Sequence, residues 1–347
     1  MNDHIHIEIN TGTILKVVLV ILFFIFLYVL KDVLIIFLFA LVIASAISPF
    51  ANWLDEKGFP RLLGVLLLFL VVLALIIAIL SLIIPYVSQD INQLTSTLPQ
   101  LVTQVSTSLE KVQQGSPQYL DFLSEIQNIL QGFSDYLQQS SQSIISLIIS
   151  IFGGVMSAIA ILIISFYLSV TKKGIENFLG SIVPEKYEDY AIDLWKRAEL
   201  KVGLWLQGQL LLGLIMGLLV YVGLSFMNIK FALILGFLAA MLEIVPMVGP
   251  VLAAIPAIFL AFLQSPSLGL WVIVFYVVVQ QLENHILVPV VLGKSVGLNP
   301  VVVIIALLVG QSLAGIPGMI LSVPLATIIV EMMDDFAKHK DSRRTST

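Results

Sequence analysis

The sequence predicts an all-α, polytopic membrane protein, and two observations carry this prediction. Of the 347 residues, 59% are hydrophobic and 11% are charged, with a mean hydropathy of +1.05, whereas a soluble globular chain has about 25% charged residues. The charges are also uneven, because only four of the 128 residues between Val202 and Ile329 carry one. A water-soluble fold could not cover so much apolar surface. The composition therefore excludes a soluble enzyme, and we expect no enzymatic activity.

Other classes of function are disfavoured by what the chain lacks. The net charge is −5, so no basic surface indicates nucleic-acid binding. The chain has no cysteine, which excludes disulfides and thiolate metal sites. Gly293-Lys294-Ser295 resembles the end of a phosphate-binding loop, but Val288 occupies the position of the required first glycine. We therefore expect no metal, no cofactor and no ATP-driven pump.

Three membrane spans are expected in an N-terminal part, residues 1–85. The first two are Ile14–Leu30 and Val33–Ser48. Only two charged residues separate them, which predicts a tight turn. The third is Leu62–Ile84. Each has roughly the 20 residues that a helix needs to cross about 30 Å of hydrocarbon.

Residues 86–143 differ from the rest in being rich in Gln and Ser. Apolar residues recur at helical spacing on both sides of Gly115-Ser116-Pro117, which predicts a small extramembrane helical hairpin. A segment of residues 144–202 follows. It holds a charge-free span, Ile144–Val170, and a charged amphipathic stretch, residues 171–201, with six Lys and Arg.

Residues 203–334 are expected to form a transport module. It opens with a full span, Gly203–Phe226, in which Gly213 and Gly217 form a GxxxG pattern that permits close helix packing. A second full segment, Gly269–Leu292, lies further along. The remaining tail, residues 335–347, is basic.

Two pairs of apolar segments in this module are too short to cross a bilayer. They have 13 to 15 residues each, at most about 22 Å as helices. Gly and Pro interrupt both pairs, and paired interruptions of this kind point to a transporter binding site. A re-entrant hairpin explains each pair, giving about six full spans plus two broken hairpins; broken helices that cross would give eight spans. Hairpins are favoured because they place Lys294 inside. The pairs are residues 231–245 with 251–263, joined by Pro246 to Pro250, and residues 300–314 with 318–331, joined at Gly315.

The orientation follows from Lys and Arg in the loops. Residues 86–143 contain one basic residue, residues 171–201 contain six, and the tail adds four. We therefore expect the 86–143 hairpin outside and both termini inside.

Carboxylates near these breaks are the candidate functional groups. Glu243 lies one turn before Pro246, and a polar run from Gln280 to His285 follows eleven largely apolar residues. An ionised carboxylate inside a membrane is costly unless it meets water, an ion or a partner. The structural alternatives are a protonated Glu243 and a polar knot around Glu283. His285 alone makes no metal site. The candidate solute or ion pathway comprises Glu243, Pro246, Gly249, Pro250, Gln280, Gln281, Glu283, Asn284, Gln311, Gly315 and Gly318.

Three stretches resemble the autoinducer-2 exporter family of bacterial permease-like membrane proteins. They are Gly208-Gln209, the sequence LEIVPMVGPVLAAIPA from Leu242 to Ala257, and the sequence QQLENHILVPVVLGKSVGLNPVVVIIALLVGQSLAGIPGMILSVPLATI from Gln280 to Ile328. The resemblance covers roughly the last 150 residues by motif. Met247 stands where an aromatic residue is expected and His285 where another polar residue is expected, and both differences bear on substrate choice.

The resemblance implies a homo-oligomeric secondary transporter in a bacterial inner membrane. Members similar to the founding exporter move a small polar quorum-sensing furanone, and others resemble sodium or lithium/proton antiporters. Our main expectation is gradient-driven export of a small polar solute such as autoinducer-2 by alternating access. A monovalent cation/proton antiporter is the alternative within transport, with a proton or sodium as coupling ion. A non-transporting envelope protein, whose 86–143 hairpin binds a partner, is the alternative of another class.

Overall fold

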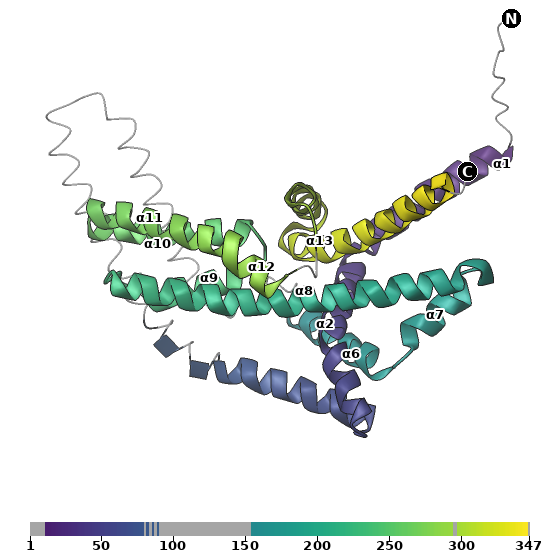
Figure 1. The fold of residues 1–347 in the computed structure, drawn as a ribbon, viewed down its shortest axis with the longest axis horizontal. Coiled ribbons are helices and arrows are strands. Elements are labelled where there is room, and N and C mark those ends of the chain that lie inside the picture. Colours follow the sequence, from purple (N-terminus) through teal and green to yellow (C-terminus); the bar gives the residue numbers. More distant parts are fainter. Residues whose placement is uncertain are drawn as a thin grey trace, which may run out of the picture.

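The computed structural model describes residues 11–79, 81–82, 85–86, 89, 154–293 and 297–345, and the described elements are helices (Figure 1). Five of these helices are long and apolar enough to cross a membrane, or six if the bent pair 156–170 and 174–182 is one span. The prediction of an all-α polytopic protein is thus confirmed. Most of the predicted 86–143 hairpin and the first part of the span after it lie outside the described residues.

The first two helices meet at a single residue. α1 (Thr11–Val29) and α2 (Lys31–Glu56) are separated by Leu30, and Leu34 N–H donates to the Leu30 carbonyl at 2.9 Å as it would inside a helix. The two helices make few contacts with each other. The expected tight turn is therefore wrong: with neither Gly nor Pro at the junction, the chain bends at Leu30 without folding back. A third helix, Arg61–Ile79, follows.

The charged stretch and the fifth span are largely one helix. α6 (Val155–Val170) leads into the short α7 (Gly174–Ile182), at 84° to it. α8 (Glu185–Phe226) then runs for 42 residues, about 63 Å. It starts directly after Pro184, with Glu185 and Glu188 in its first turn, where acidic side chains favour a helix N-terminus. No helix breaker follows before the apolar half, so the boundary expected near residue 202 is absent.

The first broken pair folds back on itself. α9 (Ala232–Leu242) and α10 (Val248–Gln264) pack together, and α11 (Pro266–Leu282) packs on α10. With its amide oriented to satisfy both groups, Gln264 at the end of α10 donates to the Asn228 carbonyl and accepts from Lys230 N–H, just before α9. The two ends of the pair therefore meet, as in a hairpin. In Figure 1 this hairpin lies along one half of α8.

The second broken pair lies inside α13 (Pro300–Thr345), whose helical geometry is interrupted at Ala314 and Gly315. Gly315 has φ 60°. Beyond it the backbones of Gly310 and Gly318 come into direct contact, whereas eight residues of straight helix would separate them by about 12 Å. Figure 1 shows the two limbs running in different directions. The second limb extends to Thr345, so the tail expected as a separate segment continues this helix. The π-helical turn η2 (Glu283–Leu287) and α12 (Val288–Val291) connect α11 toward α13.

Two apolar cores lie along α8. One joins its end near Leu224 to the α9–α10 hairpin and α11. The other joins Val202 and Trp205 to α2, α6, Val245 and both limbs of α13. A single helix thus supports both broken hairpins.

An ion-pair network joins the charged half of α8 to the second limb of α13. Arg197 contacts Glu331 at 2.7 Å and Asp335 at 2.5 Å, and Lys201 also pairs with Glu331. Glu331 and Asp335 are 7% and 8% exposed. We call these four residues the α8–α13 ion network. It fixes the second limb at a point well away from the Gly315 break.

Candidate functional site

The α9–α10 break buries Glu243. α9 ends at Leu242, and Met247 adopts a left-handed φ of 64° before α10 begins. Gly249 then lies directly against the Leu242 carbonyl and the Glu243 amide, where a Cβ atom would not fit. This close turn leaves Glu243 only 2% exposed. The glycine at position 249 thus allows the chain to reverse tightly around the carboxylate residue.

Glu283 is buried at the start of the π-helical turn. Val288 N–H bonds the Glu283 carbonyl, five residues back, and the next residue, Pro289, has no N–H to continue the α-helical pattern. Glu283 is 3% exposed, and Gln280 donates its side-chain N–H to the carboxylate at 3.1 Å. Single π-helical turns inside helices occur frequently at functional sites. The turn here begins at the buried carboxylate itself.

The two carboxyl groups share one interior region. Glu243 packs beside Gly213 of α8, and Val291, at the end of the α12 helix that follows the π-helical turn, packs beside Gly208 of the same helix. Among the described residues, no Lys, Arg or His forms an ion pair with either group. Burying an uncompensated carboxylate costs several kcal/mol. The pair therefore favours a bound proton, a bound cation or a polar ligand, which is the chemistry that a coupled transporter uses.

Two buried polar residues close to Glu243 were not among the site residues predicted from the sequence. Gln209 of α8 is 1% exposed and donates its side-chain N–H to the backbone carbonyl of Glu243. Trp205, one turn earlier, is fully buried. The Gln209 Oε1 and the Trp205 Nε1 both lack a hydrogen-bond partner in the described part of the chain. The available signal was spacing, because Trp205, Gln209 and Gly213 recur every four residues on one face of α8.

Gly213 and Gly217 of α8 allow the α9 helix to pack closely against α8. A Cβ atom at Gly213 would meet the Ala240 carbonyl at 2.8 Å, and one at Gly217 would meet the Gly236 carbonyl at 2.9 Å. These contacts are too close for a larger residue. The small residues hold α9, and with it Glu243, tightly against α8.

The other candidates divide between the interior and the surface. Pro250 is buried, and Pro246, Gln280 and Gly318 are half-buried. Gly318 packs on Gly310 within α13. The remaining candidates, Gln281, Asn284, Gln311 and Gly315, are exposed, and nothing lies within 4 Å of the position where a Cβ would stand on Gly315. The structure thus brings Glu243, Gly249, Gln280 and Glu283 into the interior and leaves the Gly315 break at the surface.

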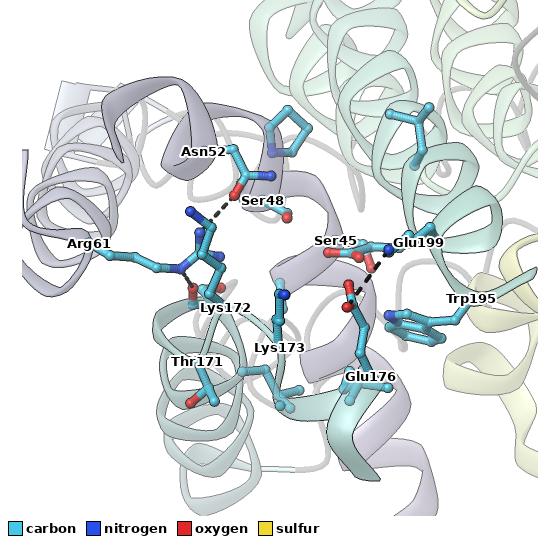
Figure 2. Close-up of a pocket in the computed structure, with 18 of the residues that line it drawn as sticks. Ser45, Ser48, Asn52, Arg61, Thr171, Lys172, Lys173, Glu176, Trp195 and Glu199 are labelled. Atoms are coloured by element: carbon cyan, nitrogen blue, oxygen red, sulfur yellow. Dashed lines mark hydrogen bonds and ion pairs between the residues drawn. The ribbon is translucent and has the colours of Figure 1, made fainter. Parts of the chain in front are cut away.

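A polar cavity of about 530 Å³ lies apart from the carboxyl pair (Figure 2). α2, the end of α6, the start of α7 and the charged half of α8 form its walls. Lys172 pairs with Asp55 at 2.6 Å, and Lys196 pairs with Glu176 at 3.8 Å. Arg61 donates to the Ser169 and Val170 carbonyls and to Asn52. The connection after α2 and the connection after α6 therefore lie on the same side of the molecule.

His285 was considered above as a metal ligand, and clusters of His, Asp and Glu side chains are what could hold a metal ion around it or elsewhere among the described residues. No group of three His, Asp or Glu side chains there is placed to hold a metal ion. His285 is exposed, and its Nδ1 lies 3.1 Å from the Gln281 carbonyl.

The apolar spans and the broken helix pairs define the chain as a polytopic membrane protein. Comparison with known proteins places it more narrowly. The sequence model of the AI-2E family of transporters matches residues 17–338. The chain belongs to this family.

Bacterial relatives agree with that assignment. YueF of Bacillus subtilis (strain 168) is 30% identical over 283 residues, covering 79% of this chain and 76% of its own. YrrI of the same organism is 25% identical, covering 89% and 88%. YhhT of Escherichia coli (strain K12) is 25% identical, covering 86% and 83%. The names of all three refer to transport and specify no solute.

Proposed function

We propose that the chain is a gradient-driven secondary transporter that exports a small polar solute, such as autoinducer-2, from the bacterial cytoplasm. The observation that carries this proposal is the buried pair Glu243 and Glu283 at a broken helix, without a basic partner among the described residues. Purely structural carboxylates would cost stability at this position. A proton that binds and leaves this pair would instead link the gradient to solute movement.

Alternating access requires parts that can move against each other. The α9–α10 hairpin carries Glu243 and is connected to the rest of the chain through short breaks at both ends. We propose that residues 203–334, containing this hairpin and most of α13, move relative to the N-terminal helices. The second core, where α2 and α6 meet α8 and α13, is the surface along which such a movement would occur.

Homo-oligomer formation is part of the same proposal. The most apolar stretches of the helix Arg61–Ile79 and of α13 are only 11% and 6% buried within one chain. Lipid and sister subunits are the two surroundings in which such faces are stable. The Lys and Arg counts support a cytoplasmic location for the 171–201 stretch and for the C-terminal tail.

A monovalent cation/proton antiporter is the second candidate, and the same carboxyl pair favours it. Two carboxylates and the free Oε1 of Gln209 are oxygen ligands of the kind that hard cations prefer. A non-transporting envelope protein has no comparable support, because an anchor gains nothing from buried carboxylates.

Flux measurements in proteoliposomes separate these candidates. An imposed proton or sodium gradient should drive efflux of a polar solute if the chain is an exporter, and should drive sodium or lithium exchange if it is an antiporter. Glu283→Gln keeps the shape of the side chain and removes its negative charge. This variant should abolish the coupled flux, whereas Asp189→Asn, an exposed carboxyl on α8, should leave it unchanged. If the Glu283→Gln variant transports at the wild-type rate, the two carboxyl groups have only a structural role.

A further inference from the structure

The corner between α6 and α7 marks the level of the membrane surface. α7 leaves the apolar α6 at 84°, after residues 171–173. With α6 along the bilayer normal, α7 therefore lies nearly parallel to the membrane plane. Phe178 and Ile182 of α7 are 61% and 63% exposed, while the helix also packs on α8. A short helix in this position buries exposed apolar side chains among the lipid headgroups and the first acyl carbons.

The polar cavity of Figure 2 has this corner as one wall. Residues 171–176 line it, together with the end of α2 and part of the charged half of α8. Leu41 of α2 and Leu168 of α6, from the apolar parts of their helices, also line it. The cavity thus combines charged and apolar walls at the level of the headgroups.

Half of the charged side chains in this cavity are paired with each other and half are not. Lys172 pairs with Asp55 at 2.6 Å, and Lys196 pairs with Glu176 at 3.8 Å. The remaining charged lining residues form no ion pair within the described part of the chain; they are the cations Arg61 and Lys173 and the carboxylates Glu56 and Glu199. The cavity therefore offers unpaired charges of both signs.

We propose that this cavity binds the headgroup of a zwitterionic phospholipid, with the phosphate at Arg61 and Lys173 and the ammonium group at Trp195 and Glu199. Lys and Arg are the side chains that bind phosphate oxygens through charge-assisted hydrogen bonds. Arg61 uses its Nε and Nη1 on Ser169, Val170 and Asn52, which leaves Nη2 for a ligand. α7 also begins at this wall without a side-chain cap, and a helix N-terminus favours an anion.

The ammonium end has partners of a different kind. Trp195 and Glu199 both line the cavity and lie four residues apart, on one face of α8. No Lys or Arg among the described residues lies over the Trp195 ring. An ammonium group is attracted to the face of an indole and to a carboxylate. In Figure 2, Trp195 and Glu199 lie across the cavity from Arg61, with Lys173 between them.

The balance of charge selects a zwitterion over an anion. The lining includes four basic and four acidic side chains; they are Arg61, Lys172, Lys173 and Lys196, and Asp55, Glu56, Glu176 and Glu199. These charges cancel, so the cavity has no net attraction for an anionic headgroup. A phosphodiester without an ammonium group would also leave Glu56 and Glu199 unpaired beside it. The apolar walls favour a ligand that carries acyl chains over its water-soluble headgroup.

Native mass spectrometry of the full chain in a maltoside detergent tests the selectivity. The probes are dioctanoyl-phosphatidylethanolamine, dioctanoyl-phosphatidylglycerol, which lacks the ammonium group, and glycerophosphoethanolamine, which lacks the acyl chains. The first bound phosphatidylethanolamine should have an affinity about three- to tenfold higher than either of the other two. Equal affinity for phosphatidylglycerol would overturn the zwitterion, and equal affinity for glycerophosphoethanolamine would overturn the lipid in favour of a soluble phosphodiester.

Two charge-removing variants test the two ends of the headgroup separately. Lys173→Gln should weaken both lipids about threefold, because both contain the phosphate. Glu199→Gln should weaken phosphatidylethanolamine by a similar factor and leave phosphatidylglycerol unchanged or tighter, so it should remove the selectivity. A merely structural role of Glu199 would weaken both lipids alike.

Lys186→Gln and Asp189→Asn are the matched controls, because both residues are exposed on α8 and neither lines the cavity. They should leave the affinities of both lipids unchanged. Wild-type affinity for phosphatidylethanolamine in both Lys173→Gln and Glu199→Gln would overturn the site. None of these measurements involves a transported solute, so the lipid site and the transport function can fail independently.

Discussion

At the scale of single residues, the site depends on a glycine as much as on its carboxylates. Gly249 lies against the backbone of Leu242 and Glu243, so even one methyl group there must displace main chain. Such displacement is costly because backbone atoms, unlike the end of a flexible side chain, cannot move alone. Glu243 keeps its position only while residue 249 has no side chain.

Gly249→Ala should therefore impair both folding and transport. We expect a loss of about 1–3 kcal/mol in stability, as for other overpacked positions, and a strong decrease in gradient-driven flux. Thermal unfolding in detergent and flux in proteoliposomes measure the two effects. Gly12→Ala on α1 is the matched control, since no atom lies within 4 Å of its Cβ position. There alanine should be neutral or slightly stabilising, because it favours helix over glycine. Equal behaviour of the two variants would contradict the close turn at Gly249.

Sequence reasoning found the buried carboxylates but not their polar neighbours. Glu243 and Glu283 stand out because a charge in an apolar run needs a reason. Gln209 and Trp205 do not, since an amide or an indole in a membrane helix has many ordinary explanations. Only the packed structure reveals that one atom of each is left without a partner.

At the scale of elements, the α8–α13 ion network holds the second limb of α13 in place. Arg197 bridges Glu331 and Asp335, both buried. Removal of one partner from a buried ion pair leaves the other charge uncompensated, which costs about 3–5 kcal/mol. Since the Arg197 side chain is 33% exposed, water screens part of this effect.

Arg197→Ala should accordingly destabilise the protein by about 1–3 kcal/mol and loosen the second limb of α13. Thermal unfolding and amide hydrogen exchange of residues 318–335 measure the two effects. Lys16→Ala, which removes an exposed charge on α1, should change neither. Unaltered exchange in Arg197→Ala would mean that apolar packing alone holds the limb.

Helix positions were easier to predict than helix connections. The breaks at Pro246–Pro250 and at Gly315 follow from Pro and Gly, whose backbone preferences act locally. The continuity of α8 through residue 202 and the bend at Leu30 could not be predicted in the same way. Charged residues mark where a chain leaves lipid, but they do not end a helix, so composition and helix boundaries need not coincide.

At the scale of the whole molecule, the same-side placement of two connections agrees with the expected orientation. Lys172, after α6, pairs with Asp55 at the end of α2, and the charge counts predict that both connections face the cytoplasm. The contact between Lys172 and Asp55 is observed in the structure and does not depend on the Lys and Arg counts. The sides themselves are set only by those counts.

Cysteine labelling in intact cells decides the orientation. Gln113→Cys should react with an impermeant thiol reagent from outside, and Glu185→Cys should react only after the membrane is opened. The native chain adds no background because it has no cysteine. The reverse labelling pattern would show that the protein has the opposite orientation in the membrane. Lys294→Cys should behave like Glu185→Cys if the broken pairs are hairpins, and labelling from outside would indicate crossing helices.

The length of α8 has a mechanical consequence. This helix of about 63 Å carries the ion network on its charged half and the α9–α10 hairpin on its apolar half, with the α2 crossing between them. A rigid rod pivoting near its middle turns a small rotation into a large displacement at both ends. A tilt of about 10° would move each end by roughly 5 Å, about the pitch of one helical turn. If the contact with α2 acts as the pivot, a change at Arg197 should therefore displace the α9–α10 hairpin at the other end of α8.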